Sequence, residues 1–450
     1  MNQKVLDSTT VATSHPTGFY FFFWGEFAER CSYYGMRAIL VLYLTTVLAF
    51  EQGDANRTSF SFKAACYFLP LLGGFLADRF FGKYWTIVGF AIPYVLGHFV
   101  LGIQNNFALV IALVLLACGS GVIKPNISAL MGLTYDEKRP GQAALRSSAF
   151  LWYYFAINVG AVISQFALPN LRDHLLREGY DAGFAYRIAF QFPAWLMVAA
   201  LGIFAAGKRF YAVEVIDRTP KKASPEEVKQ RWETLSTLFG IFALMTAFWV
   251  AYEQNDNLWV FFCKDHVDPV LNLGFMEKEF APDGFQFINA LSILILVPFF
   301  GWMWKTIDPQ GTRFKPATKI FIGFLATGVT ISWMALGAYL ASDGERVSAW
   351  WMVLAYALLT VGEILVYGTG LELSYAAAPA NMKGFITACF LVTIAMGDLL
   401  NIPLSPLYKE QIGETAFFAL TAGIVFAASI AFYFVGRRFN RGPSQAPTAG

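Results

Sequence analysis

The chain has 450 residues, of which 56% are hydrophobic, 17% are aromatic and only 14% are charged. No soluble domain has this composition, and it indicates a membrane protein. The formal net charge is only +2, so no large basic face marks nucleic acid as a partner.

Apolar runs of roughly 20 residues, the length that crosses a hydrocarbon core of ~30 Å, recur along the whole chain. A spanning β-barrel would instead show alternating segments of ~10 residues, and runs such as ALVIALVLLACGSGVI do not alternate. The start of the chain lacks the pattern of a cleavable signal peptide. We therefore predict an all-α polytopic membrane protein with twelve transmembrane helices at approximately 18–50, 60–80, 84–103, 107–133, 143–168, 184–206, 234–256, 284–305, 317–341, 349–376, 383–407 and 414–436.

The lysines and arginines set the predicted orientation, because basic residues in short loops favour the cytoplasm. With both termini in the cytoplasm, most of the 33 basic residues fall in cytoplasmic segments. An odd number of spans would spoil this asymmetry, which supports twelve. Only Arg30, Arg37 and Lys124 are expected inside spans.

One long polar connection at 207–233 divides the chain into six spans before it and six after it, as in a two-bundle transporter. The segment GGFLADRFFGK at 73–83 resembles the loop signature of the major facilitator superfamily. The predicted parts are a cytoplasmic tail, an N-terminal bundle, a cytoplasmic linker, a C-terminal bundle and a second cytoplasmic tail, at 1–17, 18–206, 207–233, 234–436 and 437–450.

The five cysteines are scattered and make neither a disulfide framework nor a metal cluster. We expect them to be small apolar fillers between helices. No metal site is predicted.

The first predicted helix contains GEFAERCSYYGMRAIL at 25–40, which is unusually rich in ionisable residues. A charge at mid-bilayer costs something like ~3 kcal/mol or more, so these side chains are expected to face a bundle interior or a water-filled cavity. At 100° per residue, one face of this helix carries four charged residues and two tyrosines: Glu26, Glu29, Arg30, Tyr33, Tyr34 and Arg37.

Other predicted helices supply matching polar groups: Lys124, Asn158, Glu253, Asn289 and Glu363. The N-terminal half offers mostly cations and the C-terminal half carboxylates. This division suits a small zwitterion, with its carboxylate held by Arg37 and Lys124 and its ammonium by Glu363. Without substrate, Arg37 is expected to pair with Glu253, and Lys124 with Glu363, so that one side stays closed.

A structural alternative remains open, in which these charges are static ion pairs that fix helix packing. Pairs kept only for packing are mediocre compared with apolar contacts, which favours the binding interpretation. His98 is expected to be a satisfied core or interfacial histidine. Asp398 and Glu372 receive no role.

Several motifs resemble those of the proton-dependent oligopeptide transporters. GEFAERCSYYG is similar to the ExxER-F-x-YYG signature of their first helix, with Cys31 in place of the usual phenylalanine, and YYFAINVG is similar to the FYxxIN-x-G motif of their fifth. ADRFFGKYWTI and GEILVYGTGLELSYAAAPANMKG also resemble family segments. The resemblance implies a major facilitator fold that imports di- and tripeptides together with protons.

The same resemblance implies roles for individual residues. Arg37, Lys124 and Asn158 would contact the peptide carboxylate and backbone, and Glu363 and Asn289 would hold its amino group. The aromatic residues expected to line side-chain pockets are Tyr33, Tyr34, Tyr67 and Trp249. The residues expected to couple protons are Glu26, Glu29, Arg30 and Glu253.

Three departures from the family pattern are expected to matter. The short central connection predicts that the extra helix pair found between the bundles of many bacterial members is absent. The second-helix histidine of animal members corresponds to Phe60, so proton coupling would rest on carboxylates. An eleventh-helix tryptophan corresponds to Cys389, which leaves side-chain preference open.

The expected partners are di- and tripeptides, protons and the lipid bilayer, and the protein is expected to be a multi-pass monomer in the cytoplasmic (inner) cell membrane. No cofactor is expected, and protons serve as the coupling ion. A transporter of another small anion such as nitrate, a receptor and a channel remain alternatives. An enzyme is not expected, because the four histidines form no paired metal-ligand or nucleophile motif.

Overall fold

The computed structural model describes residues 14–214, 224–310, 312–377 and 383–440, and these are mostly helical. The helices in the first half of the chain are α1 (Thr17–Thr46), α2 (Gln52–Leu76), α3 (Lys83–Leu101), α4 (Asn106–Lys138), α5 (Ala143–Arg177) and α6 (Ala182–Ala206). Those in the second half are α7 (Pro225–Tyr252), α8 (Leu258–His266), α9 (Phe287–Ile307), α10 (Pro316–Leu340), α11 (Trp350–Glu363), α12 (Thr369–Ala377), α13 (Lys383–Leu404) and α14 (Glu414–Asn440).

Short elements connect or extend these helices. The π-helical turns are η1 (Ala77–Phe81) and η4 (Ile364–Gly368), and the 3₁₀ turns are η2 (Lys208–Phe210), η3 (Gly284–Gln286) and η5 (Ser405–Leu407). Between α8 and α9, strands β1 (Val270–Asn272) and β2 (Glu277–Glu279) form an antiparallel hairpin.

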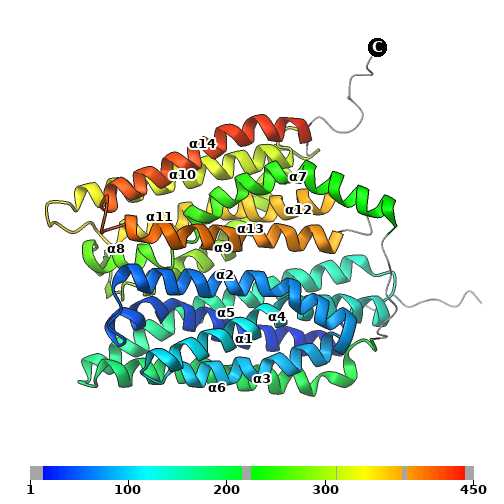
Figure 1. Cartoon of the computed structure of the whole chain (residues 1–450), viewed down its shortest axis with the longest axis horizontal. Helices are drawn as coiled ribbons and strands as arrows, with labels where there is room; N and C mark the ends of the chain where they lie inside the picture. Colours follow the sequence, from blue (N-terminus) through cyan, green and yellow to red (C-terminus); the bar gives the residue numbers. More distant parts are fainter. Residues whose placement is uncertain (1–13, 215–223, 311, 378–382, 441–450) are drawn as a thin grey trace, which may run out of the picture.

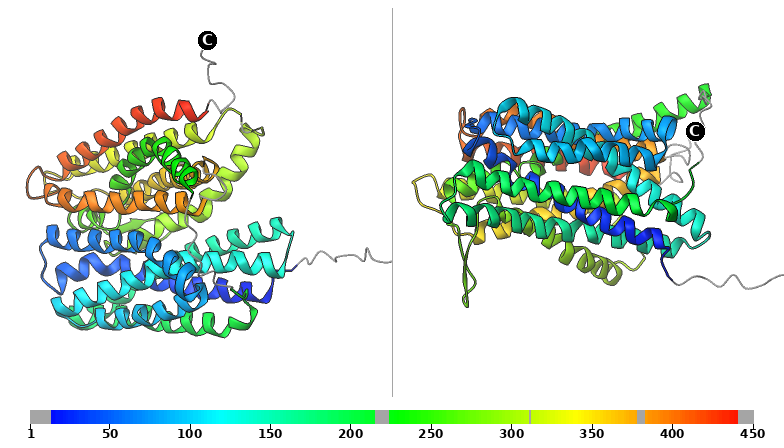
Figure 2. Two further views of the ribbon diagram at one scale, coloured as in Figure 1. Left: turned by 45° about the vertical axis from the view of Figure 1, so that its right-hand side comes forward. Right: turned by 90° about the horizontal axis from the view of Figure 1, so that it is seen from below.

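The two halves of the chain occupy separate layers (Figure 1; Figure 2, left). Helices α1 to α6 pack on one another, mainly through the pairs α3–α4, α1–α5 and α1–α6, and the second half is held by pairs such as α10–α14 and α7–α13. The halves meet mainly where α2 lies against α13 and α5 against α9. The exact bundle boundaries remain a prediction.

Close approach within the first half depends on glycines, as expected where helices pack without a hydrophobic driving force between them. A Cβ atom on Gly73 of α2 would come within 2.7 Å of the Val122 Cα of α4, and one on Gly160 of α5 within 2.9 Å of the Phe27 carbonyl oxygen of α1. These contacts hold α2 close to α4 and α5 close to α1.

Every predicted span overlaps a helix of the structure. Ten helical segments are long and apolar enough to cross a membrane, or eleven if the bent α7 counts as one span, among the described residues. Helix α1 is not one of them, because every 18-residue stretch of it holds at least three charged residues. The chain is a multi-pass membrane protein, and the number twelve remains a prediction.

Two predicted helix starts are too late. Helix α2 begins at Gln52 instead of about residue 60, and α7 begins at Pro225 instead of about residue 234. At α7 the Ser224 side chain accepts a hydrogen bond from the Glu227 backbone N–H while the Glu227 carboxylate accepts one from the Ser224 N–H. This capping box starts a helix, but hydropathy does not detect it because the first turns are charged.

The region between α6 and α7 bears on the predicted absence of an extra helix pair. Its described residues, 207–214 and 224, contain only the turn η2. Residues 215–223 lie outside the described part of the chain. Part of the predicted linker is helical, because α7 already occupies 225–233.

The helix of the seventh predicted span, 234–256, ends earlier than expected. Helix α7 ends at Tyr252, residues 253–257 form a turn, and α8 starts at Leu258. The sequence of the turn, EQNDN, is entirely polar, yet all five side chains are buried. Irregular backbone at membrane depth is tolerated where it is buried in protein or lines a cavity, so this turn marks a place where the rest of the fold supplies polar partners.

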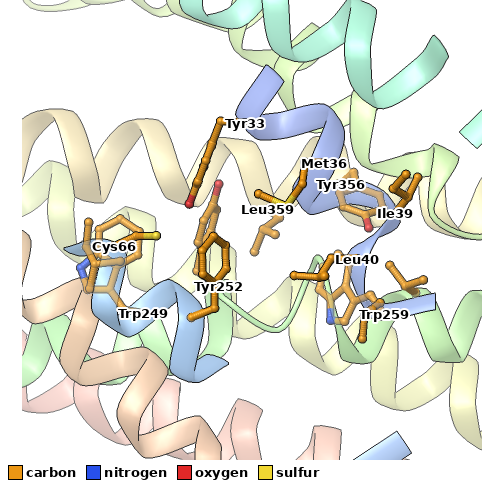
Figure 3. Packing of buried hydrophobic residues seen from close by; sticks show 14 of the residues in the cluster. Tyr33, Met36, Ile39, Leu40, Cys66, Trp249, Tyr252, Trp259, Tyr356 and Leu359 are labelled. Atoms are coloured by element: carbon orange, nitrogen blue, oxygen red, sulfur yellow. The ribbon is translucent and has the colours of Figure 1, made fainter. Parts of the chain in front are cut away.

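An apolar cluster joins the halves beside this turn. Figure 3 shows Met36, Ile39 and Leu40 of α1 together with Tyr356 and Leu359 of α11 and Trp259 of α8. All six side chains are fully buried in one hydrophobic core. This packing closes the end of the molecule that carries the α1–α2 connection.

Candidate functional site

A cavity of about 310 Å³ lies between the two halves. It is closed on one side by the contacts of α1 with the turn at 253–257. The polar and aromatic residues that line it are Arg30, Tyr34, Arg37, Tyr67, Lys124, Tyr154, Asn158, Gln165, Trp249, Tyr252, Glu253, Asn255, Gln286, Asn289, Glu363 and Tyr367.

Of the residues predicted to bind substrate, all but Tyr33 line this cavity. Tyr33 is 4% exposed and packs within the apolar core, with its ring 5.4 Å from the Arg30 guanidinium carbon. The charged face of α1 is wider than the cavity, so the part of it that carries Tyr33 is covered by neighbouring helices. The expectation that Tyr33 lines a side-chain pocket is therefore corrected.

One wall of the cavity is cationic. Arg37 of α1 and Lys124 of α4 both line it, and the Lys124 ammonium lies 5.0 Å from the centre of the Tyr67 ring. On the same side, the Asn158 side chain donates to the Tyr154 carbonyl oxygen at 2.9 Å. A ligand carboxylate would find both charge and an amide group on this wall.

The opposite wall carries a carboxylate. Glu363, the last residue of α11, accepts a hydrogen bond at 2.9 Å from the Asn289 amide, which also donates to Thr360 Oγ1 at 2.9 Å. The π-helical turn η4 follows directly after Glu363, and such turns are frequent at functional sites. The site can therefore hold a cationic group at this end.

The predicted pair between Lys124 and Glu363 is not formed. Within the described part of the chain, Glu363 is held by Asn289 instead, and Lys124 faces the Tyr67 ring. The cavity separates the two wall charges, so each remains available to a ligand. The expectation that this pair closes one side is wrong for this conformation.

The predicted contact between Arg37 and Glu253 does occur, with Nη2 3.7 Å from Oε2. The closer partner of Arg37 is Asp256, which accepts a hydrogen bond from the Arg37 Nε. Both carboxylates lie in the turn between α7 and α8, and both are buried. Arg37 thus spans from the cavity wall to the closed end of the molecule.

Lys63 is a third member of this group, and the sequence interpretation missed it. It lies inside α2, is fully buried, and its ammonium lies 3.0 Å from a carboxylate oxygen of Glu253, 2.8 Å from one of Asp256 and 3.4 Å from one of Asp398 of α13. The prediction that only three basic residues lie inside spans is therefore wrong. Two features of the sequence could have revealed this charge group: Lys63 falls within the predicted span 60–80, and the polar run EQNDN lies at the end of the seventh predicted span.

The first-helix cluster lies apart from this group. The Arg30 Nε is 3.1 Å from Glu26 Oε1 and also pairs with Glu29, and all three side chains are at most 2% exposed. Glu26 and Glu29 border a small separate cavity beside α3, α4 and α6, whereas Arg30 also reaches the main cavity. Arg30 is the connection between the buried carboxylates and the binding cavity.

Phe60 and His98 are buried as structural residues. The Phe60 ring lies 4.6 Å from the Lys63 ammonium. A cation therefore lies beside the residue that we aligned with the second-helix histidine of animal family members. His98 Nε2 is 3.0 Å from the hydroxyl of Ser32, which itself donates to the Pro193 carbonyl oxygen. Cys389 is partly exposed and lies outside the lining of the cavity.

Additional polar contacts join the halves at the closed end. Arg172 of α5 makes a two-pronged ion pair with the buried Asp283, whose longer hydrogen bond is 3.0 Å. Ser59 of α2 donates to the Asn257 side-chain oxygen at 2.9 Å, and Gln286 donates to the Ala38 carbonyl oxygen at 3.1 Å. The conformation is therefore one in which this end is sealed by both apolar and charged contacts.

A histidine at the end of α8 should make stability depend on pH. His266 Nε2 is 2.6 Å from Glu414 Oε2, and this hydrogen bond raises the pKa of His266 above its ordinary value. A raised folded-state pKa contributes stability below the ordinary value of about 6.5, and this is lost as pH rises through the raised value. Between about pH 6 and about pH 8, melting in detergent should fall on the order of 1–2 °C more for the wild type than for His266→Gln.

The exposed His174 provides the control for that measurement. His174→Gln should keep the pH dependence of the wild type, because this side chain is exposed at the end of α5. Equal pH profiles for the wild type and His266→Gln would show that the His266–Glu414 contact does not stabilise the fold.

Comparisons with known proteins identify the family of this chain. A family model described as "POT family" matches residues 84–224 and 213–420. The chain belongs to the POT family. Among its relatives, "Peptide transporter PTR2" of Saccharomyces cerevisiae is 27% identical over 92% of this chain and 78% of its own length.

Human "Solute carrier family 15 member 2" is 29% identical over 70% of this chain. The match spans only 48% of that relative, so the chain corresponds to about half of the length of the animal proteins that it matches. The structure resembles that of an "auto inhibited POT family peptide transporter" with a TM-score of 0.81, 26% identity, and 96% and 99% of the two chains covered.

A second solved structure, "the POT family transporter PepTSo", gives a TM-score of 0.80 at 28% identity, covering 95% of this chain and 99% of the other. The POT family members matched here are named as transporters, not as enzymes. The major facilitator fold and the family that the motifs predicted are confirmed. The roles of individual residues stay predictions.

Proposed function

We propose that this POT family protein is a symporter that imports di- and tripeptides together with protons by alternating access. The observation that carries the proposal is the cavity between the halves, with Arg37 and Lys124 on one wall and Glu363 with Asn289 on the other. Such opposed charges suit the two ends of a free peptide, and the 310 Å³ volume suits a small one. Protons are the coupling ion, and no cofactor is required.

Individual residues take the following proposed roles. The peptide carboxylate and backbone are held by Arg37, Lys124 and Asn158, and the amino group by Glu363 and Asn289. Side chains are received by Tyr34, Tyr67 and Trp249, while proton coupling involves Glu26, Glu29, Arg30 and Glu253. We place the protein as a monomer in the cytoplasmic (inner) membrane, with both termini in the cytoplasm.

Alternating access requires the seal at the α1–α2 end to open while the opposite end closes. The sealed contacts lie on the side that we predict, from the distribution of basic residues, to face the outside of the cell. The present conformation then corresponds to a carrier that is closed to the outside. Opening would separate Arg37 and Lys63 from their carboxylates across the interface.

Uptake into liposomes tests the proposal. Purified protein should accumulate a labelled dipeptide against its gradient when an inward proton gradient is imposed, and an uncoupler should abolish the accumulation. Liposomes without protein give the baseline, and nitrate supplied in place of peptide tests the alternative substrate. Failure to move any di- or tripeptide would overturn the proposed function.

A further inference from the structure

The charges at the closed end do not balance. The first half of the chain contributes two cations, Arg37 and Lys63, and the second half contributes three carboxylates, Glu253, Asp256 and Asp398. Arg37 is 11% exposed, and the other four side chains are at most 2% exposed. If every group were ionised, one negative charge would be buried without compensation.

The hydrogen bonds identify which carboxylate is left over. An ammonium group has three donors, and Lys63 uses them on the Glu253 carbonyl oxygen at 2.8 Å, Glu253 Oε2 at 3.0 Å and Asp256 Oδ1 at 2.8 Å. Arg37 donates to the other oxygen of Asp256. Both cations are thus engaged by Glu253 and Asp256, and these four groups form a neutral set.

Asp398 receives none of these donors. Its side chain is 0% exposed, and neither of its oxygens has a hydrogen-bond partner among the residues that the structure describes. Its nearest cation, Lys63, is 3.4 Å away with its protons directed elsewhere. An ionised carboxylate in such a place costs several kcal/mol or more, and a buried group of this kind takes up a proton instead.

The charged and titratable groups that face Asp398 lie on α1, α2 and the turn between α7 and α8. They are Arg37 of α1, Lys63 and Cys66 of α2, and Glu253 and Asp256 of the turn before α8. The two cations are neutralised by the two carboxylates of the turn, and the cysteine is uncharged. The surroundings therefore supply no net positive charge to hold an ionised Asp398.

We propose that Asp398 is a proton-binding site of the closed end: closing this end takes one proton from the adjoining solution onto the Asp398 carboxylate, and opening returns it. The inference rests on the proposed function, because it requires the halves to separate here. When they do, two cations leave with α1 and α2, and water reaches the three carboxylates. A hydrated aspartate is ionised above about pH 4, so the proton is then released.

This site makes closure depend on pH even without peptide. The closed state binds one more proton than the open state, so acid favours closure. By linkage, the closed-to-open ratio should fall by about tenfold for each unit of pH increase. Peptide contacts and the first-helix cluster play no part in this effect.

A distance measurement between spin labels tests the proposal in detergent-solubilised full-length protein. The labels are placed on Asp54→Cys at the start of α2 and Glu345→Cys in the α10–α11 connection, both exposed at the closed end. The partly exposed native Cys118 and Cys389 are replaced by alanine. Between about pH 6 and about pH 8, the closed-to-open ratio should fall by roughly 100-fold without peptide.

Asp398→Asn should remove the pH dependence of the closed-to-open ratio and keep the end closed from about pH 6 to about pH 8. Asp398→Ser is the second variant if the Asn variant does not fold. Glu178→Gln, at the exposed end of α5, is the matched control and should keep the wild-type slope. A wild-type slope in both Asp398 variants, or no slope in the wild type, would overturn the proposal.

Infrared spectroscopy provides an independent readout. At neutral pH the wild type should show the carbonyl band of a protonated carboxyl group, and Asp398→Asn should lose the intensity of one such group. An unchanged band would place the proton elsewhere. Because neither measurement uses peptide, a failed uptake experiment overturns the proposed function alone, whereas a flat pH response with intact proton-driven uptake overturns only this site.

Discussion

Replacing Lys63 by methionine should open the end of the molecule that the structure shows closed. Lys63 is the only cation hydrogen-bonded to Glu253 among the described residues, and it also binds Asp256. Removing one partner from a buried charge group costs about 3–5 kcal/mol. Opening relieves that cost by letting water reach the carboxylates, so the closed-to-open ratio should fall by roughly two to three and a half powers of ten at about 1.4 kcal/mol per decade.

The label distance across the α1–α2 end measures this change. Lys63→Met should show mainly the open distance and should lose peptide accumulation. Lys264→Met, on an exposed lysine of α8, is the matched control and should leave both unchanged. Adding Glu253→Gln to Lys63→Met removes one anion as well, so the double variant should close again. A closed label distance in Lys63→Met alone would show that Lys63 does not stabilise the closed end.

Capping the ends of a dipeptide should weaken its binding strongly. An N-acetyl group removes the ammonium that Glu363 would hold, and a C-terminal amide removes the carboxylate that Arg37 and Lys124 would hold. Each lost charge-assisted contact costs about 1.5 to 3 kcal/mol, which is roughly 10- to 150-fold in affinity. Competition of each capped dipeptide against labelled free dipeptide in proteoliposomes measures these losses separately.

A variant assigns the amino-terminal loss to its residue. In Glu363→Gln, N-acetylation of the dipeptide should cause almost no further loss of affinity. The loss of affinity on C-amidation should stay as in the wild type, because the cationic wall is unchanged. Such a selective loss is the signature of a direct pair in a double-mutant comparison. A doubly capped dipeptide that competes as well as the free one would contradict the model of two charged walls.

Much of the fold could be predicted because apolar runs and polar connections are local features. Each predicted span overlaps a helix, and the cavity contains Arg37, Lys124, Asn158 and Glu363, which the sequence selected on four different helices. The helix starts were less accurate. Charged first turns such as that of α7 lower the hydropathy of a segment even where a capping box begins the helix.

The charge group at the closed end could not be predicted in the same way. Lys63 lies close to the start of the predicted second span, where a lysine is easily counted as a loop residue. Asp256 and Asp398 are separated by more than a hundred positions along the chain, and only the packing of α13 on α2 brings both to one lysine. Helical periodicity shows that a face is charged, but it does not show which helix covers that face, as Tyr33 illustrates.

The polar turn at 253–257 also affects how the protein is made. A segment with five polar side chains is costly to place in a bilayer without partners for them. Chains are synthesised from the N-terminus, and early domains generally fold first, so Arg37, Ser59 and Lys63 already stand in the membrane when the turn arrives. The first bundle then acts as an assembly template for the second, and a C-terminal half produced alone would enter the membrane without the partners of its seventh span.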